Sequence, residues 1–266
     1  MIGILFFGDV VAKAGRRALH KNLPSLKVKY NPDLVIANGE NAAGGIGLTP
    51  EVAEELFIMG IDVLTSGNHI WKHKEIFPYL DSKSDKVIRP LNYPTREEFA
   101  TPGLGYTLVK KQNAEILIVN IMGRTFIEVL DCPFKAIDYV LKKYPLQKGR
   151  AIIVDFHAET TSEKEAMGWY LNGKVSAMVG THTHVQTADD RILPDGTAYI
   201  TDVGMCGSMD SIIGVDRDVI IQKFITQRPI AFKFSENNLG VNAVYLEVDE
   251  STGKAQKIER IFTREN

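Results

Sequence analysis

The stretch Leu34-Val35-Ile36-Ala37-Asn38-Gly39-Glu40-Asn41 joins a short apolar run to two side chains that can bind a metal ion. A run of this length, ended by glycine, predicts a strand buried on both faces. Four other apolar runs also end in acidic, amide or imidazole side chains. They lead into Gly8-Asp9, Gly67-Asn68-His69, Asp155-Phe156-His157 and Thr181-His182-Thr183-His184. One such ending would mean little, but five predict a metal centre at the carboxyl edge of a sheet.

Size and composition are those of a globular protein. The 266 residues fit one large domain, so we expect a single domain over residues 1–266. The hydrophobic content of 44% and the charged content of 24% are ordinary. The formal net charge of −2 argues against an extended nucleic-acid surface, which normally shows as a basic excess. It leaves room for a small nucleotide substrate, which needs only a local positive site.

No segment predicts secretion or membrane insertion. Nowhere do about 18 apolar residues run together, so no membrane span is expected. The chain runs from Met1 into Ile2–Phe7 without the basic region of a signal peptide. Two cysteines, Cys132 and Cys206, cannot form a disulfide scaffold and are expected to be reduced. We therefore expect a soluble, cytoplasmic protein.

Strand-like runs alternate with helix-like patterns through most of the chain, which predicts an α/β protein with a mixed, layered sheet system. Thr49-Pro50 predicts a helix start, and that helix should end near Gly60. The segment from His69 to Leu80 predicts a short helix, and the tail from Pro229 to Phe262 predicts antiparallel strands. Further helices are expected at Lys13–Tyr30, Phe134–Tyr144 and Thr161–Leu171.

Seven candidate ligands fall at or just past the ends of predicted strands. They are Asp9, Glu40, Asn41, Asn68, His157, His182 and His184. Carboxylate, amide and imidazole groups without a thiolate suit a hard or borderline divalent ion. Taken singly, an aspartate after a strand is usually a cap or turn residue, and a lone buried histidine is usually a core residue. Their coincidence on five strands is what predicts a site.

His182 and His184 flank one residue. In an extended segment they would point the same way, whereas on a turning loop they could reach two adjacent ions.

These motifs resemble the signature of the calcineurin-like metallophosphoesterases, with three departures. Asp9 is not followed by the usual Asp-x-His histidine, the second motif is Gly39-Glu40-Asn41 instead of Gly-Asp, and Thr181 replaces the glycine of Gly-His-x-His. Together with residues 38–45 and 201–205, they look like the YmdB-like subfamily of bacterial phosphodiesterases. The resemblance covers nearly the whole chain.

The resemblance implies a four-layer α/β/β/α sandwich with two mixed sheets and a dinuclear centre. One ion would take Asp9, Glu40, Asn41 and His184, and the other would take Glu40, Asn68, His157 and His182. Glu40 would then bridge the two ions, and His69 would act as the general acid instead of binding metal. Family members are associated with iron, with manganese as a substitute, and the same ligands suit zinc or cobalt. The family also suggests a homo-oligomer.

The implied reaction is hydrolysis of 2′,3′-cyclic nucleotides, such as 2′,3′-cyclic AMP, to 3′-nucleotides. A hydroxide bridging the two ions would attack phosphorus while His69 protonates the leaving oxygen. One alternative is a phosphomonoesterase, or a phosphodiesterase for another substrate. Another is a regulatory nucleotide- or RNA-binding protein with a structural metal site, against which His69 argues because a scaffold metal needs no acid.

Three further residues have no settled role in the sequence. His73 is expected at the surface or beside the site. Arg124 would contact phosphate or form a salt bridge, and Cys206 is expected in a loop at Gly204–Gly207.

Overall fold

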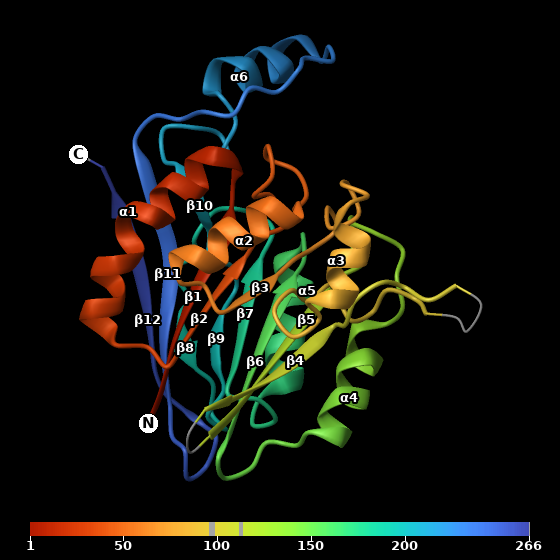
Figure 1. The fold of residues 1–266 in the computed structure, drawn as a ribbon, viewed down its shortest axis with the longest axis vertical. Helices are drawn as coiled ribbons and strands as arrows, with labels where there is room; N and C mark the ends of the chain where they lie inside the picture. The colour runs from red at the N-terminus through yellow and green to blue at the C-terminus, as the bar shows by residue number, and fades with distance from the viewer. Residues whose placement is uncertain (96–98, 112–113, 266) are drawn as a thin grey trace.

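The computed structural model describes residues 1–95, 99–111 and 114–265, which form two six-stranded sheets (Figure 1). The first sheet runs in the order β12 (Ala255–Arg264), β11 (Leu239–Val248), β10 (Met205–Ser208), β1 (Ile2–Val10), β2 (Leu34–Asn38) and β3 (Val63–Thr65). The second runs in the order β4 (Tyr106–Lys111), β5 (Ala114–Met122), β6 (Arg150–His157), β7 (Ala177–Thr181), β9 (Ala198–Ile200) and β8 (Arg191–Ile192). Each sheet contains both parallel and antiparallel neighbours.

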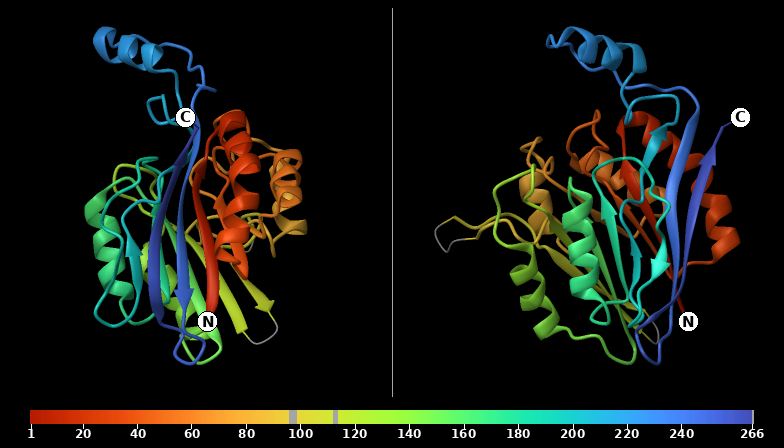
Figure 2. Two further views of the ribbon diagram at one scale, coloured as in Figure 1. Left: turned by 90° about the vertical axis from the view of Figure 1, so that its left-hand side faces the viewer. Right: turned by 180° about the vertical axis from the view of Figure 1, so that it is seen from behind.

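Helices cover the two outer faces (Figure 2). The first sheet packs against α1 (Ala12–Tyr30), α2 (Pro50–Met59) and α3 (Ile76–Ser82). The second sheet packs against α4 (Pro133–Lys143) and α5 (Thr161–Leu171). The predicted α/β/β/α sandwich with two mixed sheets is therefore confirmed. One further helix, α6 (Arg217–Thr226), projects beyond the layers at the top of Figure 1.

Strand β1 shows why the apolar runs are continuous. Ile4 and Phe6 face the core between the two sheets, where Ile118 and Ile153 of the second sheet meet them. Leu5 and Phe7 alternate with them and face the core beneath the helices of the first sheet. Successive side chains of a strand point to opposite faces, so a strand with both faces covered must be apolar at every position.

Helix α2 begins and ends as its sequence predicts. The Thr49 hydroxyl accepts a hydrogen bond from the Val52 backbone N–H at 3.3 Å, and Pro50 is the first helical residue. Gly60 ends the helix with a left-handed φ of 105°, which glycine adopts without steric cost.

The predicted helix from His69 to Leu80 is wrong over its first half, because α3 begins only at Ile76. The backbone between Gly67 and Ile76 forms tight turns instead, in which Ile70 N–H donates to Gly67 and Lys72 N–H donates to His69. These turns keep His69 beside the strand ends.

The loop expected at Gly204–Gly207 is also wrong. Met205–Ser208 is strand β10, and Cys206 is buried in it, opposite Val10 of β1. This strand is short and contains a glycine, so it gives no apolar run. Helix α6 was not predicted from the sequence. Asp216 caps its N-terminus, where the carboxylate accepts hydrogen bonds from the Asp218 and Val219 backbone N–H groups.

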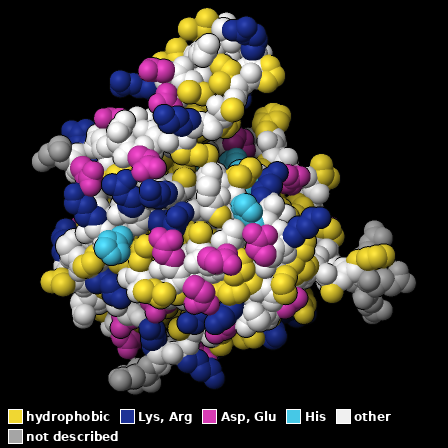
Figure 3. Space-filling view, turned by 45° about the horizontal axis from the view of Figure 1, so that its top comes forward, with side chains coloured by type: hydrophobic (Ala, Val, Ile, Leu, Met, Phe, Trp, Pro, Cys, Tyr) yellow, Lys and Arg dark blue, Asp and Glu magenta, His cyan; other side chains and the backbone are white. Residues whose placement is uncertain are grey.

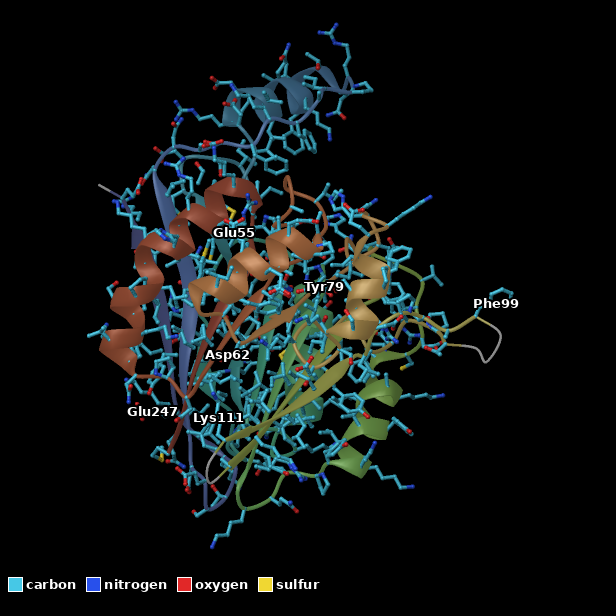
Figure 4. All side chains as sticks on the ribbon, viewed as in Figure 1. Glu55, Asp62, Tyr79, Phe99, Lys111 and Glu247 are labelled. Carbon is cyan, nitrogen blue, oxygen red and sulfur yellow. The ribbon has the colours of Figure 1, made fainter. Side chains whose placement is uncertain are left out.

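Side chains fill the space between the layers (Figure 4). Lys111 and Glu247 lie at the lower end of the strands, far from α6. Within the part of the chain that the structure describes, no helix combines the length and apolarity needed to cross a bilayer.

Candidate metal centre

The carboxyl ends of five strands meet at the edge of the sandwich that lies below α6 (Figure 1). They bring all seven predicted ligands, and His69, into one network of contacts. These residues are Asp9 on β1, Glu40 and Asn41 after β2, Asn68 and His69 after β3, His157 at the end of β6, and His182 and His184 after β7. Parallel strands produce this convergence because their carboxyl ends share an edge.

One group of donor atoms surrounds His157 Nε2. Glu40 Oε1 lies 3.2 Å from it, Asn68 Oδ1 lies 3.3 Å from it and His182 Nδ1 lies 3.0 Å from it. Glu40, His157 and His182 each offer a ligand atom within 4.8 Å of the others. A single proton on Nε2 cannot satisfy three acceptors. A cation among these atoms would satisfy all of them.

A second group forms around His184 Nε2. Asn41 Nδ2 lies 3.1 Å from this nitrogen, and Asp9 Oδ1 lies 3.8 Å from it. Asp9 is fully buried, and its Oδ1 has no hydrogen-bond partner among the described residues. An unpaired buried carboxylate oxygen is costly, and a bound cation removes that cost. The residues present therefore fit a metal ion here as well.

The Asn41 amide adopts one particular orientation. Its nitrogen faces His184 and, at 3.2 Å, Glu40 Oε1, whereas its oxygen lies 2.8 Å from His69 Nδ1. Metal ions bind the amide oxygen, so Asn41 could serve as a ligand only with its amide turned over.

His184 and His182 each bond an acceptor outside the network through one ring nitrogen, which leaves a lone pair on the nitrogen that faces the network. His184 Nδ1 lies 3.0 Å from the Ile213 carbonyl oxygen, which can only accept, so Nδ1 carries the proton. His182 Nε2 lies 3.0 Å from the Glu159 carboxylate, which orders that ring in the same way. The remaining nitrogens, His184 Nε2 and His182 Nδ1, face the two groups of donor atoms. Carboxylates and carbonyls in this position are typical of metal-binding histidines.

His157 is held by two residues that the sequence analysis missed. The Thr181 hydroxyl lies 2.9 Å from His157 Nδ1 and donates to Asp155 Oδ1 at 2.7 Å, so it accepts from His157. Asp155 is fully buried and also accepts from Asn38 Nδ2 at 3.1 Å. Asp155 and Thr181 stood inside the quoted motifs, but their spacing along the chain gives no sign that they meet.

Burial and charge perturb the titratable groups. Burial acts to raise the pKa of Glu40, but the charges and hydrogen bonds of His157 and His69 together outweigh burial and hold this pKa well below its usual range. Burial acts to lower the pKa of His157, and the Glu40 carboxylate raises it to about 9. Burial, and next the charge of His157, lower the pKa of His182 to about 3. Burial raises the pKa of Asp9.

Without metal, His157 therefore carries the positive charge that balances Glu40. A metal ion at these atoms would replace this proton, as metal binding to histidine generally does.

His69 sits at the edge of the network and stays partly open. Its Nδ1 lies 2.8 Å from Asn41 Oδ1 and 3.2 Å from Glu40 Oε1, and 27% of its side chain is exposed. Its backbone N–H donates to Glu40 Oε2 at 3.3 Å. These contacts fix the ring through Nδ1 and leave Nε2 for proton exchange with a bound molecule.

Close packing explains the glycine before Asn68. A Cβ atom at Gly67 would lie 2.1 Å from Glu40 Oε2 and 2.3 Å from His157 Nε2. Any side chain at this position would displace the candidate ligands.

A buried ion pair secures the loop after β7. Lys164 Nζ lies 2.7 Å from Asp202 Oδ2, and both side chains are fully buried. Asp202 also accepts from the backbone N–H of Thr183 at 3.0 Å and from its hydroxyl at 2.7 Å. Thr183 lies between His182 and His184, which have positive φ values of 98° and 65°. Such conformations persist only where the surroundings hold them. Asp202 lies in residues 201–205, which were cited for the family resemblance. Lys164 lies inside a predicted helix, and nothing in the sequence indicates that it pairs with Asp202.

The network forms one side of a cavity of about 530 Å³. An apolar wall of the same cavity consists of Ile46, Ile213, Val215, Phe232 and Phe234. Figure 3 shows histidine surface in the hollow between the projecting segment and the body, with hydrophobic side chains nearby.

The three residues without a settled role lie outside this network. His73 is partly exposed, and its Nε2 lies 3.0 Å from the Ile46 carbonyl oxygen. Arg124 is exposed and does not line the cavity, and its backbone N–H donates to Glu163. Burial of Cys206 raises the pKa of its thiol. None of the three is placed to act on a molecule in the cavity.

Comparisons with known proteins agree with this architecture. Residues 5–261 match the family described as YmdB-like protein. A 2′,3′-cyclic-nucleotide 2′-phosphodiesterase from Bacillus subtilis is 48% identical over 263 residues, which cover 99% of this chain and 97% of that protein. The crystal structure of a novel phosphatase from Mycoplasma pneumoniae has a TM-score of 0.92 to this structure and covers 99% of this chain and 93% of that one. The two sequences are 39% identical.

A calcineurin-like phosphoesterase from Bacillus subtilis shares the fold, with a TM-score of 0.54 at 12% identity over 99% of this chain and 90% of that one. The two-sheet sandwich is thus the fold of the calcineurin-like phosphoesterases, and the chain belongs to the YmdB-like protein family.

Proposed function

We propose that this enzyme hydrolyses 2′,3′-cyclic nucleotides to 3′-nucleotides with two divalent metal ions. One observation carries the proposal: inward-facing imidazole nitrogens and the unpaired Asp9 Oδ1 converge at one side of a cavity. The name of the Bacillus subtilis relative supports the substrate class, since cleavage of the 2′ bond leaves a 3′-nucleotide.

The two groups of donor atoms support a ligand assignment. One ion would be held by Asp9, Glu40, Asn41 and His184, and the other by Glu40, Asn68, His157 and His182. Glu40 is proposed as the shared ligand because it contacts both Asn41 and His157. Iron is the proposed native metal, and manganese, zinc and cobalt suit the same donor atoms. Ions bound there would neutralise phosphate charge and lower the pKa of bound water.

The proposed role of His69 follows from its position. Asn41 and Glu40 hold its Nδ1, so a proton on Nε2 can pass to the ribose O2′ as the bond between phosphorus and O2′ breaks. Transfer of that proton prevents a full negative charge from building on the leaving oxygen.

A phosphomonoesterase is the second candidate, because the Mycoplasma pneumoniae relative is described as a phosphatase. Charge favours the diester. Two divalent ions would bring four positive charges, and Asp9, Glu40 and one hydroxide would bring three negative ones. The remaining charge of about +1 complements a singly charged diester better than a doubly charged monoester. A regulatory nucleotide- or RNA-binding protein with a structural metal would have no use for His69.

The test compares manganese- or iron-loaded protein on 2′,3′-cyclic AMP, 3′,5′-cyclic AMP and a phosphomonoester. We expect 2′,3′-cyclic AMP to be turned over fastest, with 3′-AMP as the product by chromatography. An Asp9→Ala variant, which removes a proposed ligand, is the negative control. Preferred turnover of the monoester would support the second candidate, and no turnover of any diester would contradict the proposal.

Three other expectations stay predictions: a single domain over residues 1–266, a cytoplasmic location and a homo-oligomer. Sedimentation of the intact chain would test the last.

A further inference from the structure

Four of the five residues of the apolar wall belong to an arm formed by residues 212–235, which includes α6; they are Ile213, Val215, Phe232 and Phe234. The arm leaves and rejoins the body as a pair of extended segments. Val215 pairs with Phe234, Asp216 N–H donates to the Lys233 carbonyl oxygen at 2.8 Å, and Ser235 N–H donates to the Gly214 carbonyl oxygen at 3.0 Å. These bonds fix the backbone that carries Phe232.

Phe234 anchors the arm to the body. A Cβ atom at Gly45 would lie 1.9 Å from the Phe234 ring, so the ring packs directly on the glycine backbone. Gly45 follows the Glu40 turn, and its φ is 92°. The wall is thereby held at a fixed position relative to the candidate metal centre.

Phe232 presents an aromatic surface that is not buried in the protein core. Its ring is 50% exposed although it lines the cavity. Lys223 Nζ on α6 lies 4.5 Å from the ring centroid, a distance typical of a cation–π contact. An exposed ring that is held in place is a low-entropy platform for stacking.

We propose that this wall binds the nucleobase of the substrate, with Phe232 as the stacking platform. The inference rests on the proposed function, because it places the cyclic phosphate at the polar side of the same cavity. The volume of about 530 Å³ lies within the range of about 300–1,000 Å³ that is typical of small-ligand pockets. The lining combines polar side chains of the candidate metal centre with apolar ones of the wall, as a nucleotide requires.

The chemistry of the wall also predicts its selectivity. Its five side chains carry no hydrogen-bond donor or acceptor that could distinguish the edges of different bases. Every base has a stacking face. The enzyme should therefore bind substrates that carry a base more tightly than base-free ones, and it should accept purines and pyrimidines alike.

The experiment measures kcat and KM of manganese-loaded protein on three five-membered cyclic phosphates. Two carry a base, 2′,3′-cyclic AMP and 2′,3′-cyclic UMP, and glycerol 1,2-cyclic phosphate carries none. We expect Phe232→Ala to raise KM for both nucleotides by about 5- to 30-fold, as stacking energies of about 1–2 kcal/mol convert. The kcat values and the base-free reaction should change less than about twofold.

Two further variants control the design. Phe232→Trp keeps an aromatic face and should retain the wild-type KM. Phe224→Ala removes a phenylalanine from the same arm that is 68% exposed and does not line the cavity, so it should change nothing.

A binding measurement separates the two proposals. Calorimetric titration with 3′-AMP should show about 5- to 30-fold weaker binding to Phe232→Ala, whether or not the protein turns over a diester. An equal loss on the base-free substrate, or unchanged nucleotide KM and 3′-AMP affinity, would overturn the base-binding wall. Absence of diester turnover by the wild type, with 3′-AMP binding still dependent on Phe232, would contradict only the proposed function.

Discussion

The two sides of the cavity are built in opposite ways. The polar side stands on strand ends of both sheets, and Asp9, Glu40 and His157 are fully buried there. Most of the apolar wall stands on a projecting arm, where Phe232 is half exposed and Phe224 on α6 is largely exposed. Metal chemistry needs ligand atoms fixed to a fraction of an ångström, whereas stacking tolerates small displacements. Changes to the polar side should therefore cost far more activity than changes to the arm.

The largest effect should follow Glu40→Gln, which keeps the shape of the side chain but removes the charge. We expect kcat/KM for 2′,3′-cyclic AMP to fall about 10³-fold or more, because a proposed ligand of both ions loses several kcal/mol of charge stabilisation. Bound metal, measured by elemental analysis, should fall as well. Glu159→Gln alters an acidic residue that is 48% exposed and whose carboxylate pairs only with His182 among the described residues, so the loss of activity should be much smaller. A fully metallated, active Glu40→Gln enzyme would refute the proposed bridge.

His69→Ala should lower activity on 2′,3′-cyclic AMP by about 10²- to 10⁴-fold, the range for loss of a general acid. Its metal content should stay at the wild-type level. Hydrolysis of bis(4-nitrophenyl) phosphate should fall far less, since nitrophenolate leaves without a proton. His73→Ala is the matched control, because His73 bonds the Ile46 carbonyl oxygen outside the network. An equal loss on both substrates would point to a different role for His69.

Asp155→Asn tests the support behind His157. The amide keeps the volume but cannot accept from Thr181, Thr65 and Asn38 as the carboxylate does. We expect manganese affinity or activity to fall about 10- to 100-fold, the usual cost of altering a group that orients a metal-binding histidine. Thermal unfolding of the metal-free variant gives the control for folding. Unchanged manganese affinity in a folded variant would show that Thr181 alone orients the ring.

Lys223→Ala should give the smallest effect, on the arm side. Removing the cation–π contact with Phe232 costs about 0.5–1 kcal/mol, so KM for nucleotides should rise about two- to fivefold at constant kcat. Arg217→Ala on the same helix, whose guanidinium pairs only with the adjacent Asp218 among the described residues, is the control. A loss as large as that of Asp155→Asn would mean that the arm takes part in the chemistry.

Local signals account for what the sequence predicted well. Thr49, Pro50 and Gly60 act within one helix, so neighbouring residues suffice to place its ends. The helix expected from His69 was misplaced because Glu40 and Asn41, distant in sequence, hold the His69 loop in turns. Strand β10 was missed because it has no apolar run in the sequence. Its pairing with β1, which makes it a strand, forms only in the folded protein.

The sequence by itself determined the layered α/β fold and the set of candidate ligands, because strands buried on both faces must be apolar and end abruptly in polar residues. Tertiary structure alone decided how each donor is used. Thr181 of β7 bonds both Asp155 and His157 of β6, Lys164 meets Asp202 inside the core, and the arm brings Phe232 to the cavity. These contacts join segments that are far apart along the chain, and only strand pairing and the packing of helices and loops on the sheets bring them together.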